Sequence, residues 1–95
     1  MDGEDNFLTV FVHVHNKVFP VSAGDGSQRV KWLGHVAIAR WDEDYNQGWR
    51  RLGIPTAIEM MDGGFEVDMA AVIKDVLQNN EHIVVHTSLD PAETR

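Results

Sequence analysis

Histidine is the residue type whose pattern in this chain most suggests chemistry. The chain contains five histidines, and His13 and His15 stand two positions apart in a stretch that alternates between apolar and polar residues. His82 and His86 stand four apart near the end of the chain. Residues two or four apart on a strand share a face, so each pair presents imidazoles to one side. Imidazole titrates near neutral pH and ligates zinc or copper, so the pattern suggests a proton-sensitive surface or a metal site.

Other residue types that support catalysis are missing or scattered. The chain has no cysteine, which excludes thiolate nucleophiles, cysteine-type zinc sites and disulfides. The glycine-containing segments 24–26 and 62–64 lack the Gly-Lys-Ser/Thr of a phosphate-binding loop and are predicted as turns. No nucleophile elbow is present, and Glu59, Glu66 and Asp68 do not have the spacing of an acid–base pair. We therefore expect a protein that is not an enzyme and that needs no cofactor.

The charge balance narrows the class of partner. Eight Lys and Arg against fifteen Asp and Glu give a formal net charge of −7. Such a chain repels phosphate backbones and anionic lipid, so nucleic-acid and membrane partners are not expected. Residues 1–6 are polar and acidic, unlike a signal peptide, and no apolar run approaches the roughly 20 residues that span a bilayer. The missing cysteines favour a reducing compartment, and we expect a cytoplasmic protein.

The first half of the chain predicts a hairpin and a helix within a single domain. Alternation over 7–15 predicts a half-buried strand, and Asn16-Lys17 is predicted as the turn into a second strand over 18–22. Pro20 cannot donate to a ladder, so this second strand is expected at a sheet edge. The first strand is predicted to turn Leu8, Val10, Val12 and Val14 toward the core, and Phe7, Thr9, Phe11, His13 and His15 away from it.

A helix is predicted from residue 29 to residue 41, with Ser27 or Asp25 as its cap. Its core stripe is expected to be Val30, Leu33, Ala37 and Trp41. Trp32 and Val36 fall on another side of this helix and need a second cover. We expect the segment 45–52 to fold back over them with Tyr45, Trp49 and Leu52.

The second half predicts two short strands, a helix and a last strand. A strand over 57–61 is expected to turn Ile58 and Met60 inward and Glu59 and Met61 outward, and a turn at Asp62-Gly63-Gly64 leads to a brief strand over 65–67. Apolar residues at helical spacing predict a helix over 69–78 with Asp68 as its N-cap. The last strand is expected over 82–87, with Ile83 and Val85 on the core face.

The order of these elements, with Gly53-Ile54-Pro55 after the first helix, resembles that of ubiquitin-like β-grasp domains. The resemblance extends over residues 7–89 and implies an α+β fold with a mixed sheet of strand order 2-1-5-3-4. The first and last strands would lie parallel at its centre. One main helix would cross one face, and a second, shorter helix would precede the last strand. Residues 1–6 would be a flexible lead, and 90–95 a polar tail or the start of a linker.

Three departures from ubiquitin bear on function. An additional segment around 42–51 precedes Gly53, and the helix expected before the last strand is longer than the family's short turn. No Gly-Gly pair ends the domain, so conjugation to a substrate lysine is not implied. Glu59 stands where ubiquitin carries an aliphatic residue. The acidic charge also differs from the basic, microtubule-binding doublecortin variants of this fold.

On this fold the side of the sheet away from the helix is the candidate site. His13, His15 and His86 are expected to meet there beside Phe11 and Val84. Three interpretations follow: a solvated sheet face, a protein-docking surface with apolar anchors, or a histidine metal site. We favour docking of a protein partner, in the N-terminal domain of a larger intracellular protein; self-association through the edge strand is a further alternative. The predicted partner-binding surface comprises Phe11, His13, His15, Glu59, Met61, Val84 and His86.

Overall fold

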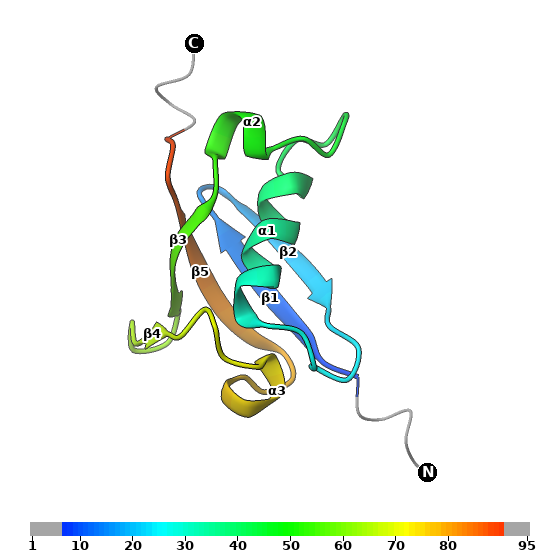
Figure 1. The fold of residues 1–95 in the computed structure, drawn as a ribbon, viewed down its shortest axis with the longest axis vertical. Coiled ribbons are helices and arrows are strands. Elements are labelled where there is room, and N and C mark those ends of the chain that lie inside the picture. Colours follow the sequence, from blue (N-terminus) through cyan, green and yellow to red (C-terminus); the bar gives the residue numbers. More distant parts are fainter. Residues whose placement is uncertain (1–6, 91–95) are drawn as a thin grey trace.

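The computed structural model describes residues 7–90, which form an α+β domain with a five-stranded mixed sheet. The elements are β1 (Thr9–Val14), β2 (Lys17–Ser22), α1 (Val30–Arg40), α2 (Trp49–Leu52), β3 (Pro55–Met60), β4 (Glu66–Val67), α3 (Ile73–Val76) and β5 (Glu81–Thr87). The strand order is β2-β1-β5-β3-β4, with β1 and β5 parallel at the centre and the other neighbours antiparallel. The predicted fold class and strand order are confirmed (Figure 1).

The core lies between the sheet and α1, which crosses one sheet face (Figure 1). Val10, Val12 and Val14 are fully buried, as alternation along β1 predicted. Gly34 of α1 lies directly against β3, because a Cβ at this position would come within 2.9 Å of Pro55 Cβ. A glycine at residue 34 therefore lets the helix approach the sheet closely.

The hairpin turn is one residue earlier than the alternation predicted. β1 and β2 pair from Thr9↔Ser22 to Val14↔Lys17, so the turn consists of His15 and Asn16. His15 has a positive φ of 53° and belongs to the turn rather than to the strand. Pro20 lies on β2 at the edge of the sheet, as expected.

The predicted helix over 69–78 is wrong in length, since only α3 is helical. The backbone before α3 pairs with the loop that leads into α1. The Ile73 amide donates to the Gln28 carbonyl, and a β-bridge joins Val72 to Arg29. These tertiary hydrogen bonds replace those that a longer helix would make, although Ile73 and Leu77 are buried as the apolar stripe predicted.

The start of α1 is held by the same backbone pairing and not by a side-chain cap. The Val30 amide donates to the Ala71 carbonyl and the Lys31 amide to the Met69 carbonyl. Arg29 occupies the N-cap position without a side-chain capping hydrogen bond, and its guanidinium donates to the Ala70 carbonyl. Asp25 instead accepts the Ser27 amide within the preceding loop. The predicted caps at Ser27 and Asp25 are therefore wrong, as is that at Asp68, which accepts the Ala70 amide in a turn.

The segment between α1 and β3 packs on the end of α1 and not along its side. The Gly48 amide donates to the Ala39 carbonyl at 3.1 Å, and Leu52 is fully buried. Tyr45 and Trp49 are 76% and 51% exposed, so the expectation that they cover Trp32 and Val36 is wrong. The backbone contact at Gly48 explains this, because it ties the segment to the last turn of the helix.

Candidate binding surface

The sheet face opposite α1 carries the side chains that alternate with the core residues. Phe11, His13 and Val84 are partly exposed there, and His82 and His86 are exposed. The hairpin register places Pro20 beside Phe11 and Val18 beside His13, so these two β2 residues belong to the same face. We call this set of residues the open face: Phe11, His13, Val18, Pro20, Ala57, Glu59, His82, Val84 and His86.

A compact ring cluster occupies the middle of the open face. Phe11 and His82 are neighbours in the parallel β1–β5 register, and their rings stack with centroids 4.7 Å apart and 14° between the planes. His13 Nε2 lies 2.9 Å from His82 Nδ1, which is a hydrogen-bond distance. His82 is therefore held between a phenyl ring and a second imidazole.

The surroundings of His13 perturb its titration. Partial burial lowers the pKa of His13 below its ordinary value, and the positive charge of a protonated His82 lowers it further. Both causes disfavour the charged imidazole, since it would be less hydrated and would face a like charge. The neutral form of His13 is thus the favoured one at neutral pH.

The β3 side of the open face is ionic. His86 Nε2 lies 3.3 Å from Glu59 Oε1, and Glu59 pairs across strands with Glu66. A protonated His86 would offset the repulsion between these opposed carboxylates. The open face therefore divides into a charged β3–β4 side and an uncharged β1–β2 side.

His15 lies apart from the ring cluster. Its Nε2 is 2.8 Å from Thr87 Oγ1, and the Thr87 hydroxyl donates to the Leu89 carbonyl at 2.6 Å. Because that hydroxyl proton is already used, His15 Nε2 must be the donor in its contact with Thr87. His15 therefore links the β1–β2 turn to the end of β5.

The structure does not bring His13, His15 and His86 together as the sequence predicted. Each binds a different partner: His82, Thr87 and Glu59 respectively. Among residues 7–90 no group of three or more His, Cys, Asp or Glu side chains is arranged to hold a metal ion. The predicted triad of imidazoles is thus replaced by one histidine pair and two separate contacts.

Sequence reasoning left His82, Val18 and Pro20 out of the surface. The predicted turn at Asn16-Lys17 pairs Val18 with His15 and Pro20 with His13, so it already implies that Val18 and Pro20 share this face, because cross-strand partners share a face. The pairing of His82 with His13 depends on the β1–β5 register, which local sequence does not specify. Of the remaining predicted residues, Met61 is 46% exposed just beyond β3, where it lines a shallow hollow of ≈ 690 Å³ with His82.

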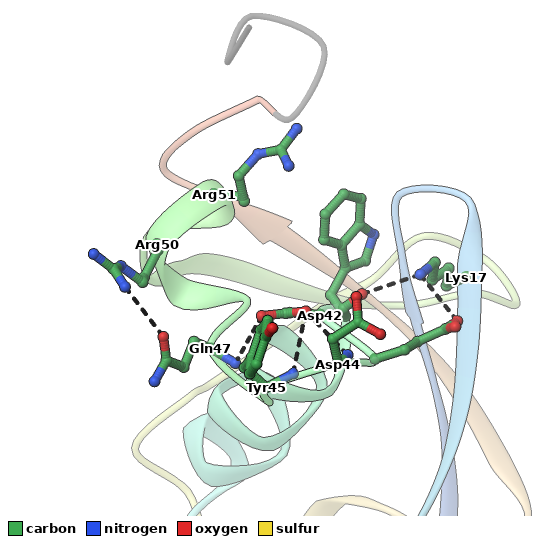
Figure 2. Close-up of a pocket in the computed structure, with 9 residues that line it drawn as sticks. Lys17, Asp42, Asp44, Tyr45, Gln47, Arg50 and Arg51 are labelled. Carbon is green, nitrogen blue, oxygen red and sulfur yellow. Dashed lines mark hydrogen bonds and ion pairs between the residues drawn. The ribbon is translucent and has the colours of Figure 1, made fainter.

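A second hollow, of ≈ 480 Å³, lies where the segment after α1 meets the β1–β2 hairpin (Figure 2). Lys17 Nζ binds the Trp41 carbonyl and Glu43 Oε2 there, and it lies 4.9 Å from the centroid of the Trp41 ring. The Asp42 carboxylate accepts the amides of Asp44, Tyr45 and Gln47. These contacts anchor the 42–52 segment, and the Trp41 indole Nε1 is buried beside them without a hydrogen-bond partner among the described residues.

Comparison with known proteins assigns the chain to no family. The sequence matches no protein-family model, and no curated protein matches it. The described part of the chain contains no helix with the length and apolar character needed to cross a bilayer. A functional assignment must therefore be argued from the open face itself.

Proposed function

We propose that this chain is a ubiquitin-like β-grasp domain that acts as a non-catalytic protein-interaction module. The partner docks on the open face, with Phe11 and Val84 as apolar anchors and the His13–His82 pair beside them. The confirmed strand order and the Gly53-Ile54-Pro55 segment support the β-grasp relationship.

The observation that carries the docking proposal is the uncharged β1–β2 side of the open face. In a chain of net charge −7, the exposed Val18 and Pro20 and the partly exposed Phe11 and Val84 form an apolar strip on neighbouring strands. Apolar residues gathered in this way, with polar groups at the margin, are typical of protein-docking patches. Phe11 is the expected hot spot, because it is a large ring held in place by its stack on His82.

The contact between the Thr87 hydroxyl and the His15 imidazole does not favour catalysis. A nucleophilic threonine must donate its proton to a base. Thr87 donates to the Leu89 carbonyl instead, and His15 donates to Thr87. This hydrogen bond therefore runs from the imidazole to the hydroxyl, which is opposite to the direction that a nucleophile and its base require.

Self-association through the edge of β2 is less favoured than docking on the face. Pro20 has no N–H to offer a new strand, and its carbonyl already accepts a hydrogen bond from Arg40 Nη1 at 3.4 Å. At Pro20 the edge therefore offers an added strand neither an N–H donor nor a free carbonyl acceptor.

The test uses matched variants on opposite faces of the domain. Wild type, Phe11→Ala and His35→Ala are immobilised and exposed to extract from the source cell, and retained proteins are quantified. His35 is exposed on α1 and serves as the control. A genuine partner is retained by wild type and His35→Ala, and its affinity for Phe11→Ala falls about tenfold or more. A partner lost by His35→Ala but kept by Phe11→Ala would place the docking site on the helix face and refute the proposal.

A further inference from the structure

The facing nitrogens of His13 and His82 can share only one hydrogen. At 2.9 Å, one nitrogen must donate and the other must accept. A neutral pair meets this condition. A pair with one added proton meets it as well, because the charged imidazole donates while the neutral imidazole keeps a lone pair on its facing nitrogen. A pair with two added protons does not, since N–H groups and positive charges then meet head to head. The second proton must therefore break the contact.

Among residues 7–90, neither His13 nor His82 forms an ion pair with a carboxylate that would hold it charged. Glu59 on β3 is paired with His86 on β5. On β5 itself, the Glu81 carboxylate accepts the Gln78 amide. Asp62, in the turn after β3, lines the same shallow hollow as His82 and Glu81, and Glu66 of β4 lies opposite Glu59. β2 presents Val18 and Pro20, which do not titrate. The lowered pKa of His13 agrees with this arrangement.

We infer that the His13–His82 pair is a proton-operated latch on the open face, closed over Phe11 with at most one added proton and opened by a second. Opening releases His82 from the Phe11 ring and leaves two positive charges beside the apolar strip. The latch is a property of the free chain, whereas its consequence for docking rests on the proposed function. With the latch closed, the open face fits a partner protein that presents an apolar, uncharged surface, because the apolar strip that this partner would cover carries no formal charge.

The direction of the pH effect on docking follows from this occupant. An apolar partner must dehydrate the imidazoles it covers, which costs more when they are charged. Affinity is therefore highest at neutral pH and falls as pH falls. For one proton released from an imidazole of ordinary pKa, the loss between pH 7.5 and 5.5 is about tenfold, and a lowered pKa makes it smaller.

The latch is tested by NMR on the full 95-residue chain, with no partner present. Imidazole ¹H and ¹⁵N shifts of each histidine are followed with pH in wild type, His82→Gln and His13→Gln, with His35→Gln as the control. We expect the His13 midpoint to rise in His82→Gln, where the like charge is removed, and to stay unchanged in His35→Gln. We also expect nuclear Overhauser contacts between the Phe11 and His82 rings at neutral pH and their loss as the second proton binds.

Two results would overturn the latch. One is a His13 midpoint that His82→Gln leaves in place, which means that the imidazoles titrate independently. The other is a Phe11–His82 ring contact that persists after both imidazoles are protonated. Neither result depends on docking, so the latch and the proposed function can be refuted separately. A partner whose affinity is unchanged by Phe11→Ala would refute docking on the open face. The NMR titration would still decide whether the latch exists. The amide spectrum of each variant verifies that it is folded.

Discussion

Aspartate substitutions at Phe11 and Val12 test which face of β1 lies in the core. The two residues are adjacent, and the structure places Val12 fully buried and Phe11 partly exposed on the open face. Val12→Asp removes an apolar side chain worth about 2 kcal/mol of burial. Keeping the new carboxyl neutral at pH 7 costs about 4 kcal/mol, and its missing hydrogen bonds cost about 2 kcal/mol more. The resulting loss of about 8 kcal/mol lies within the roughly 5–14 kcal/mol total stability expected for a domain of this length.

We therefore expect Val12→Asp to be unfolded or nearly so at neutral pH, and to regain some structure in mild acid, where its carboxyl is protonated without cost. Phe11→Asp, the same change one residue earlier, keeps its carboxylate in solvent and should remain folded. Urea unfolding followed by tryptophan fluorescence and circular dichroism measures both variants against wild type. The opposite ranking would mean that the strand register is shifted by one residue and that the proposed surface is the core.

Three further predictions follow from single features of the structure. Gly34→Ala should lower stability by about 1–3 kcal/mol in urea unfolding, because the new Cβ would press on Pro55; an unchanged midpoint would contradict the close helix–sheet approach. The lowered pKa of His13 means that the unfolded chain takes up this proton first, so stability should fall as pH falls below about 6.5, and His13→Gln should remove that part of the pH dependence. Micromolar zinc should leave the amide spectrum unchanged, because the described residues provide no group of three ligands; shifts confined to His13, His15 and His86 would instead revive the metal-site alternative.

Local pattern predicted the sheet well because burial alternates along β1, β2 and β5, although β3 has a register shift between Pro55 and Ala57. Val10, Val12, Ile83 and Val85 are buried as their period-two spacing indicated, and Pro20 lies at the edge as its missing donor required. In these segments the local preference and the tertiary environment agree, which is the condition under which sequence reasoning succeeds.

The helix expected over 69–78 failed because its backbone has partners elsewhere in the molecule. The spacing of Ile73 and Leu77 is helical and both side chains are buried, yet the chain between residues 69 and 74 bonds the loop before α1. A periodicity argument sees only side chains, so it cannot detect amides and carbonyls that are committed to a distant segment.

The side chains that share the open face were predicted in part from the sequence, whereas the contacts among them were not. Placing His13 and Phe11 on the open face needs only the alternation of β1. The pairing of His13 with His82 also needs the parallel register of β1 and β5. That register is supported at one end of the strands by the Asn80 amide on the Thr9 carbonyl and by Asn79 Oδ1, which accepts the Thr9 amide. Contacts between residues 70 apart in sequence leave no local signal.

Pro20 is the residue that favours the face of this sheet over its edge as the proposed docking site. An exposed edge strand recruits other strands through unpaired backbone groups. On β2 the middle position is Pro20, whose missing N–H and engaged carbonyl interrupt that row. Pro20 also adds an exposed apolar ring beside Phe11. One residue thus weakens the edge as a docking site and extends the apolar strip of the open face.

Pro20→Thr separates the two effects, since it restores an N–H to the edge while removing the ring from the face. We expect this variant to lose affinity for a partner that needs Phe11 and to gain a tendency to dimerise in analytical ultracentrifugation; a gain in partner affinity would show that the partner adds a strand to the edge.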